Sequence, residues 1–202
     1  MKKLSSTLPH MLLSLGLVTI IAATLLGLMH AVTAEPIARQ EKASRIEAIR
    51  KVAPPFDNDP EADAVTVAAA DGTSCTVYPA KMNGKLVGAA VATSSMAGFG
   101  GEIRIMAGFD LDGTLRDYQV LSHAETPGLG SKMELWFRDP KGARSVLGKN
   151  PGTTSFYVTK DTDPSGKAGQ IDAITAATIS SRAFLAALRD AYEVYTKTKS
   201  NE

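Results

Sequence analysis

The chain carries its longest uncharged segment near the N-terminus, between Met11 and Met29. At 1.5 Å per residue, a helix of this length spans about 30 Å, the thickness of the hydrocarbon core of a bilayer. The pattern predicts a transmembrane helix at residues 11–29 and a cytoplasmic N-terminus at residues 1–10. Lys2 and Lys3, with the small residues 32–34, keep a cleaved signal peptide as the alternative.

The next segment combines a helical pattern with a helix-stopping sequence. Ile46, Ile49 and Ala53 recur at helical spacing, which predicts a short amphipathic helix from Pro36 to Ala53. Residues 54–60 hold three prolines with Asp and Asn, and these residues cannot continue a helix. We therefore expect residues 30–60 to be a helical connector and linker, and residues 61–202 to be a separate folded domain.

In the folded domain the pattern changes to alternating strand-like positions. Two hairpins are predicted, each marked by a dipeptide typical of hairpin turns, Asn83-Gly84 in one and Asp112-Gly113 in the other. The four strands are expected at residues 76–80, 85–92, 102–109 and 114–121. Further elements are expected as a short helix at 131–138, a strand at 155–160, a polar loop at 161–169 and an amphipathic helix at 178–197. These elements predict an α+β fold, an antiparallel sheet with flanking helices, preceded by one N-terminal transmembrane helix.

Composition narrows the possible chemistry. The 22 Lys plus Arg and 21 Asp plus Glu give a net charge of +1, which argues against a nucleic-acid partner. One Cys and three His are too few for a thiolate cluster or a His-rich metal centre, so no metal site is expected. We also expect no catalytic side chains of the acid–base type. Any demanding reaction carried out by this chain would then need a bound cofactor.

The charges near the apolar segment indicate less directly on which side of the membrane the folded domain lies. Lys2 and Lys3 favour a cytoplasmic N-terminus, whereas five basic residues lie shortly after the apolar segment, between Arg39 and Lys51. Long downstream domains, however, cross the membrane largely regardless of charge. A lone Cys also suits an oxidising compartment. We therefore expect the folded domain outside the cytoplasm.

Residues 123–130, His-Ala-Glu-Thr-Pro-Gly-Leu-Gly, connect a predicted strand to a predicted helix. Pro127 fixes one backbone angle, and Gly128 and Gly130 permit positive φ and close approach of a ligand. Such a loop suits a planar cofactor. His123 and Glu125 would point to opposite sides of a continuing strand, so they do not form an acid–base pair.

Other glycines and aromatic residues carry weaker signals. The segment 98–101, Gly-Phe-Gly-Gly, lacks the spacing of a dinucleotide-binding loop, and we interpret its glycines as strand-entry residues. Trp136 and Phe137 are able to stack on a flat cofactor, but packing against the sheet is the expected role of aromatics on a short helix.

The last predicted helix begins within residues 172–181. A helix N-terminus offers unpaired N–H groups and a partial positive charge, which suit a phosphate. Thr and Ser are also ordinary N-caps. Spacing alone therefore leaves both a phosphate site and simple helix capping open.

Together the two stretches resemble the FMN-binding domain shared by the G subunit of the Rnf ion-translocating electron-transport complex and the C subunit of the sodium-translocating NADH:quinone reductase. The flavinylation signature, Asp-x-x-Ser/Thr-Gly-Ala-Thr, is matched at Asp172, Thr175, Ala177 and Thr178, with Ala176 in place of Gly. The loop signature Glu-Thr-Pro-Gly-Leu-Gly is matched at residues 125–130. Ala176 is expected to accept helical backbone angles at the helix start.

The resemblance implies FMN bound covalently through its phosphate to Thr178 by a separate flavin transferase that uses FAD. Other expected cofactor-binding residues are Asp172, Thr175, Ala176, Ala177, Ser180, Ser181, Glu125, Thr126, Gly128, Leu129 and Gly130.

The resemblance also implies a function, partners and a location. The chain is expected to be a non-autonomous electron-carrying subunit of an Rnf-type ion-translocating oxidoreductase. Its expected partners are the other membrane subunits, the flavin transferase and membrane lipid. Its expected location is the bacterial inner membrane, as a single-pass protein with a periplasmic domain. The alternatives are the C subunit of the sodium-translocating quinone reductase and a non-redox, membrane-tethered extracytoplasmic binding module.

Overall fold

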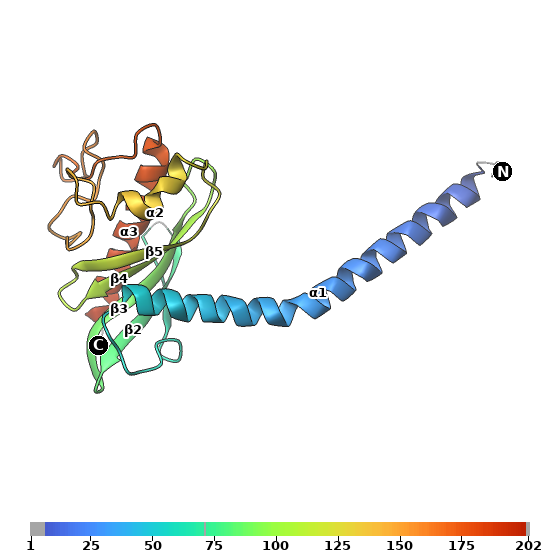
Figure 1. Ribbon diagram of the computed structural model, residues 1–202, viewed down its shortest axis with the longest axis horizontal. Helices are drawn as coiled ribbons and strands as arrows, with labels where there is room; N and C mark the ends of the chain where they lie inside the picture. The colour runs from blue at the N-terminus through green and yellow to red at the C-terminus, as the bar shows by residue number, and fades with distance from the viewer. Residues whose placement is uncertain (1–6, 71, 201–202) are drawn as a thin grey trace. The chain divides into compact units, whose positions relative to one another are not determined.

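The computed structural model describes residues 7–70 and 72–200 (Figure 1). Contacts divide the chain into one unit that ends at Arg45 and a second that begins at Ile46, and each is described by itself. Lys2 and Lys3, and most of the predicted cytoplasmic N-terminus at residues 1–10, lie outside the described residues. The functional boundaries at residues 11–29, 30–60 and 61–202 remain predictions.

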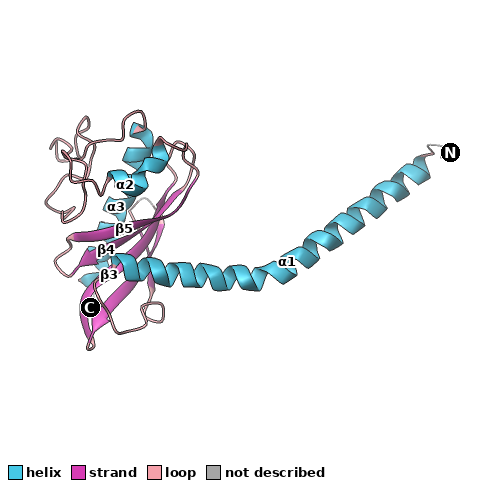
Figure 2. Cartoon of the chain, viewed as in Figure 1, coloured by secondary structure: helices cyan, strands magenta, loops and turns pink. Residues whose placement is uncertain are grey.

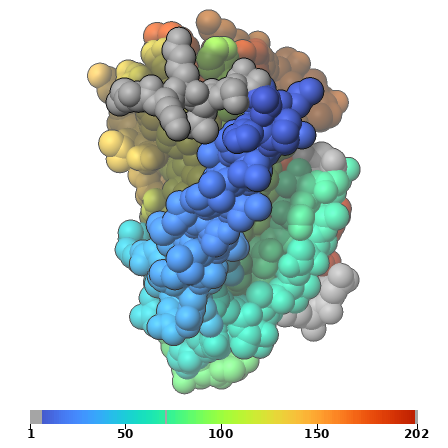
Figure 3. All heavy atoms as spheres, turned by 90° about the vertical axis from the view of Figure 1, so that its right-hand side faces the viewer, coloured from blue at the N-terminus to red at the C-terminus, as the bar shows by residue number. Residues whose placement is uncertain are grey.

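The first element, α1, runs without interruption from Leu8 to Val52. Within the described residues it is the one helix long and apolar enough to cross a membrane, by length and composition. Its large apolar side chains from Leu8 to Ile37 are exposed. Figure 3 draws this part of the chain as blue spheres. The prediction of a separate helix starting at Pro36 is wrong, because the φ of proline is close to helical and its ring removes only one backbone hydrogen bond.

The final turn of α1 belongs to the folded unit. Ala48, Ile49 and Val52 are buried in a small apolar cluster with sheet residues that include Tyr78 and Met106. The helix backbone lies so close to the sheet that a Cβ added at Gly108 would lie 1.9 Å from the carbonyl oxygen of Val52. Glycine is therefore required where this turn meets the sheet.

Five antiparallel strands form a single meander in the order β1-β2-β3-β4-β5 (Figure 2). The strands are β1 Val65–Ala68, β2 Ser74–Met82, β3 Lys85–Ser95, β4 Ile103–Asp110 and β5 Leu115–His123. The two predicted hairpins are confirmed as β2-β3 and β4-β5. Asn83 and Gly84 both have positive φ, 51° and 73°, as a two-residue turn that matches the sheet twist requires. The edge strand β1 was not predicted.

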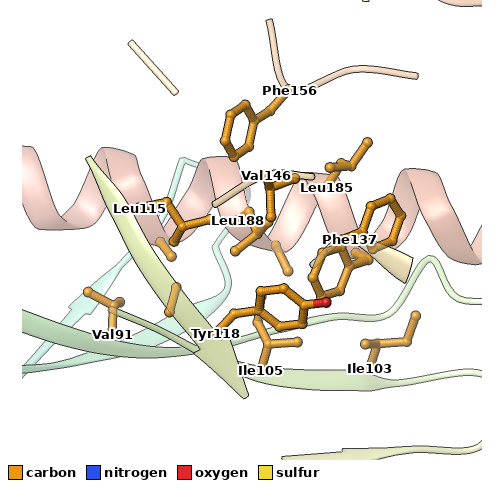
Figure 4. Packing of buried hydrophobic residues seen from close by; sticks show 14 of the residues in the cluster. Val91, Ile103, Ile105, Leu115, Tyr118, Phe137, Val146, Phe156, Leu185 and Leu188 are labelled. Atoms are coloured by element: carbon orange, nitrogen blue, oxygen red, sulfur yellow. The ribbon is translucent and has the colours of Figure 1, made fainter. Parts of the chain in front are cut away.

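Alternate residues of the strands pack on opposite faces of this sheet. Val77, Val91 and Ile105 belong to the main core, whereas their neighbours Tyr78, Ala90 and Met106 belong to the cluster around the end of α1. The main core is formed with α3, Thr178–Lys199, whose Phe184, Leu185 and Leu188 are fully buried (Figure 4). Both faces are thus covered, and the expected α+β fold with an antiparallel sheet and flanking helices is confirmed.

A short helical segment follows β5, with the 3-10 turn η1 at Gly130–Lys132 and α2 at Met133–Trp136. The Phe137 ring stacks on Phe184 of α3 at a centroid distance of 4.6 Å. The Trp136 indole donates a hydrogen bond to the carbonyl oxygen of Asp172 at 2.9 Å. Both aromatic side chains are therefore held by contacts within the protein, as expected. Their partners, however, are α3 and the segment before it, whereas packing against the sheet was predicted.

The predicted strand at residues 155–160 is wrong. Val158 forms only an isolated bridge with Ile171, outside the named strands. Phe156 and Val158 are buried in the main core, whereas the intervening Tyr157 is less buried. The alternation that resembled a strand therefore comes from a loop that inserts every second side chain into the core.

Candidate functional site

A cavity of about 360 Å³ lies where three segments distant in sequence meet. They are the glycine-rich loop after β3, the loop after β5 and the N-terminal end of α3. The cavity is lined by Phe99, Glu125, Thr126, Leu129, Gly130, Ala176, Ala177, Thr178, Ile179 and Ser180. The structure therefore brings together the two stretches that the sequence singled out, and adds a third.

The N-terminal end of α3 has no side-chain cap. Ala177 occupies the N-cap position without a side-chain hydrogen bond, and Thr178 is the first helical residue. Ser181 does not cap either, since its hydroxyl accepts the Ile174 N–H and donates to the Ala177 carbonyl oxygen, both at 2.9 Å. Helix capping by a Thr or Ser side chain, which the spacing had left open for this stretch, is therefore not what the structure shows. The uncapped first turn leaves the helix dipole available to an anion beside the Thr178 hydroxyl.

Ala176 has a φ of 63°, in the left-handed region that favours glycine. The expectation that it takes helical angles is wrong, because Ala176 is the third residue of a turn closed by a 3.0 Å hydrogen bond from the Ala177 N–H to the Ile174 carbonyl oxygen. A left-handed conformation costs a non-glycine residue about 1–2 kcal/mol. The glycine of the family's signature would adopt this left-handed φ without that cost. Ala176 adopts the same φ under strain.

Glu125 connects the three segments of the cavity. Its side chain is buried, and its two carboxylate oxygens accept hydrogen bonds from the Gly100 N–H at 3.1 Å and the Ser180 hydroxyl at 2.6 Å. A Cβ added at Gly98 or Gly130 would lie 2.6 or 2.5 Å from this carboxylate. Glycines on both sides therefore make room for a buried carboxylate that fixes the cavity wall.

His123 takes part in the same loop through its ring nitrogens. Its Nδ1 lies 3.2 Å from the Glu125 backbone nitrogen, whose N–H it accepts, and its Nε2 lies 3.5 Å from the Glu134 carboxylate. The imidazole therefore orders the start of the loop, and His123 is not among the residues that line the cavity.

Several residues expected at the cofactor lie outside the cavity lining. Asp172 accepts the Ala143 N–H at 3.1 Å with its carboxylate and so ties the 139–145 turn to the start of the signature. Ser181 is buried against the backbone, whereas Thr175 and Gly128 are exposed. Their predicted roles at the cofactor remain predictions.

An ion pair lies one helical turn beyond Thr178. Arg182 donates two hydrogen bonds, both 2.7 Å long, to the two carboxylate oxygens of Asp161. The hydrogen bonds from Arg182 hold the pKa of Asp161 below its usual range. This pairing fixes the polar loop after residue 160 to the beginning of α3.

Two lining residues, Phe99 and Ile179, are absent from the cofactor-binding residues named from sequence, and Phe99 lies outside both motifs. Its exposed aromatic ring, 70% accessible, stands in a loop whose glycines were interpreted as ordinary strand-entry residues. An aromatic side chain between glycines is a weak signal in sequence. Its position becomes informative only when the loop is seen against Glu125.

Known proteins of one family resemble this chain over most of its length. The FMN-binding domain family matches residues 98–193, a range that includes every lining residue of the cavity. The chain is 32% identical to the G subunit of the ion-translocating oxidoreductase complex of Aliivibrio fischeri, over 98% of this chain and 94% of the relative. The G subunit of the same complex of Cereibacter sphaeroides is also 32% identical, over 93% and 84%. The chain belongs to this G-subunit family.

Another member of the G-subunit family, from Stutzerimonas stutzeri, is 36% identical over 90% of this chain and 78% of its own length. The crystal structure of Shewanella oneidensis NqrC has a TM-score of 0.45 and 19% identity, covering 72% of this chain and 76% of that chain. The sequence relatives confirm the resemblance to the G subunit that was inferred from the two motifs.

Proposed function

We propose that this protein is the electron-transfer subunit of a membrane-bound, Rnf-type ion-translocating oxidoreductase, and that it carries FMN covalently on Thr178. The observation that carries the proposal is the position of the Thr178 side chain, on the wall of the cavity and in the uncapped first turn of α3. The protein acts as an electron carrier, and the oxidoreductase activity belongs to the complex.

The residues of the cavity fit FMN in chemistry and in size. The helix N-terminus suits the phosphate, and the apolar side chains of Phe99, Leu129 and Ile179 suit the flavin ring. A volume of about 360 Å³ is within the range of about 300–1,000 Å³ typical of small-molecule sites. FMN would supply the redox chemistry that side chains lack, while the protein holds and orients it.

Attachment forms one bond and breaks one bond. The Thr178 hydroxyl oxygen would bond to the FMN phosphorus of FAD, the pyrophosphate bond of FAD would break, AMP would leave, and the hydroxyl proton would be released. We propose that a separate flavin transferase performs this step. Thr178 is only partly buried and lines the cavity, which supports modification after the domain has folded.

Intact mass and in-gel flavin fluorescence test the attachment site. Full-length protein is produced in bacterial membranes with a flavin transferase, as wild type, Thr178→Ala and Thr66→Ala. Thr66 is a matched control, since it is an exposed threonine on β1. We expect an FMN phosphoryl adduct on the wild type and on Thr66→Ala, and none on Thr178→Ala. An adduct on Thr178→Ala would reject the site, and its absence from the wild type would favour the non-redox binding module.

The location is proposed on separate grounds. The apolar part of α1 would span the bacterial inner membrane in contact with lipid, with the folded domain in the periplasm beside the other subunits of the complex. Ser200→Cys introduces a thiol at an exposed position, whereas the natural Cys75 is buried. We expect a membrane-impermeant maleimide to label Ser200→Cys in intact spheroplasts. Labelling only after lysis would place the domain in the cytoplasm.

A further inference from the structure

The aromatic ring of Phe99 is exposed although its backbone is tightly held. The side chain is 70% accessible and lines the cavity that contains Thr178. Exposure of a large apolar side chain to water is unfavourable relative to its burial. A ring held open to a cavity is therefore a candidate contact for an apolar ligand surface.

The glycines on either side of Phe99 explain why its backbone is held. A Cβ at Gly100 would lie 2.0 Å from the carbonyl oxygen of Ala124, and one at Gly98 would lie 2.3 Å from that of Gly101. The Gly100 N–H also donates to the buried carboxylate of Glu125. Because the flanking glycines pack inward with no spare room, the loop presents the intervening side chain to the cavity.

Two aliphatic side chains lie partly exposed in the same cavity wall. Leu129, from the loop after β5, is 39% accessible, and Ile179, the residue after Thr178, is 49% accessible. The three apolar side chains thus come from three separate segments. They offer one ligand an apolar contact that no single segment could provide.

Other aromatic residues near α3 already have partners. Phe137 stacks on Phe184, Trp136 lies under the guanidinium of Arg144, and Tyr157 lies under that of Arg189. Among the described residues that line this cavity, Phe99 is the one aromatic. A planar ring in the cavity would therefore find its aromatic contact at Phe99.

We propose that Phe99 stacks on the isoalloxazine ring of the flavin carried by Thr178, and that Leu129 and Ile179 complete the apolar contact. This inference rests on the proposed function. Phe99 would be a positioning residue that holds the ring at a fixed orientation, since aromatic pairs prefer defined stacked or edge-on geometries. The phosphoester on Thr178 would fix one end of FMN and Phe99 the other.

Flavin fluorescence tests the contact directly, because an indole that touches an excited isoalloxazine quenches it by electron transfer. Phe99→Trp is compared with Leu111→Trp in the flavinylated full-length protein. Leu111 is the matched control: it is exposed, and its carbonyl oxygen accepts a hydrogen bond from Lys199 at the far end of α3. We expect at least about a threefold loss of fluorescence per attached flavin in Phe99→Trp and an unchanged yield in Leu111→Trp. Equal yields in the two variants would overturn the contact.

Two further variants keep the test decisive. If Phe99→Trp is not flavinylated, Phe99→Tyr gives the same readout, because a phenol in contact also quenches. Phe99→Ala should lower the fluorescence anisotropy of the attached flavin, and an anisotropy equal to that of the wild type would also overturn the contact. Absorbance and intact mass separate the two proposals. Wild type without flavin contradicts the proposed function, whereas flavin present with unchanged fluorescence contradicts the role of Phe99 alone.

Discussion

The Glu125 carboxylate accepts a 2.6 Å hydrogen bond from the hydroxyl of Ser180, 55 residues later in the chain. Its other oxygen accepts the N–H of Gly100. Two of the three cavity segments are thus held to the third by one buried side chain. The shape of the cavity therefore depends on a single residue of the loop after β5.

Replacement of Glu125 should destabilise the domain in a graded way. Glu125→Ala removes the acceptor of the buried Ser180 hydroxyl and of the part-buried Gly100 N–H, and we expect a loss of about 3 kcal/mol in the free energy of unfolding. Glu125→Gln keeps one acceptor and a group that can donate to the Ser180 oxygen, so its loss should be about 1 kcal/mol. Urea unfolding measures both. Glu134→Gln, at an exposed carboxylate, should stay within about 0.5 kcal/mol of the wild type, and an equal loss there would contradict the argument.

Ala176→Gly should stabilise the protein. Glycine removes the left-handed strain of about 1–2 kcal/mol at a φ of 63°, but adds about 0.5–1 kcal/mol of backbone entropy to the unfolded chain. The strain is the larger effect, so the net gain should be about 0.5–1 kcal/mol. Ala186→Gly, inside α3, should instead lose about 1 kcal/mol. Thermal melts compare the two, and a loss in Ala176→Gly would show that the turn is not strained.

Gly108→Ala should separate the last turn of α1 from the sheet. An added Cβ would lie 1.9 Å from the Val52 carbonyl oxygen, and backbone cannot move aside as a flexible side chain can. Overpacking in a tight core typically costs about 1–3 kcal/mol. Gly27→Ala, where no atom lies within 4 Å of the added methyl group, is the control and should leave the melting temperature unchanged. Equal melting temperatures for the two variants would count against close packing at Gly108.

Arg189→Lys should loosen the loop around Tyr157. The Arg189 guanidinium lies 3.8 Å from the Tyr157 ring centroid and donates a 2.6 Å hydrogen bond to the Phe156 carbonyl oxygen. Burial lowers the pKa of Arg189. An ammonium group lacks the planar face for this stacking. Hydrogen exchange should become about tenfold faster at residues 156–160, with little change in β4. Unchanged exchange at residues 156–160 would argue that Arg189 does not anchor the loop.

Stability should fall in acid. The pKa of Asp161 is lowered by hydrogen bonds from Arg182, that of Asp139 by the Lys141 N–H, and that of Asp163 by the Ser165 hydroxyl. A carboxyl group whose pKa is lower in the folded state stabilises the protein fully when the pH is above its unfolded pKa of about 3.9. This stabilisation is lost as the pH falls through the pKa of the folded state.

The melting temperature should therefore show no change from these groups between about pH 5 and 8, and a decline below about pH 4. Asp161→Asn should melt lower at neutral pH and decline less in acid, because an amide cannot be protonated in this range. An acid decline as steep as that of the wild type would show that this ion pair contributes nothing.

The central part of the fold was predictable because its turns are encoded locally. Asn83-Gly84 specifies a two-residue hairpin, and Asp112-Gly113 lies within the longer turn between β4 and β5. The alternation around these turns sets the faces of the strands. The edge strand β1, four residues long, offers too short a pattern to detect. The segment 155–160 alternates like a strand, but Phe156 and Val158 are apolar because they are buried in the main core, and no ladder of hydrogen bonds forms there.

The parts of the candidate site that lie in short sequence motifs could be predicted. The parts that depend on contacts between distant segments could not. Thr178 and the loop at residues 125–130 were found from their own sequences, and both line the cavity. Phe99 was missed because its role depends on where Glu125 holds the loop before β4. The left-handed Ala176 was missed because alanine rarely adopts this conformation, so nothing in its residue type indicates it.

Cys75 determines how the protein responds to redox reagents. It is the one cysteine of the chain, fully buried, and its thiol lies 3.2 Å from the Thr93 hydroxyl oxygen. A sole, enclosed thiol can neither bridge to a second one within the chain nor react readily with reagents in solution. Folding of this domain should consequently need no oxidant, so material made in a reducing cytosol and refolded with dithiothreitol can serve for spectroscopy without intramolecular disulfide scrambling.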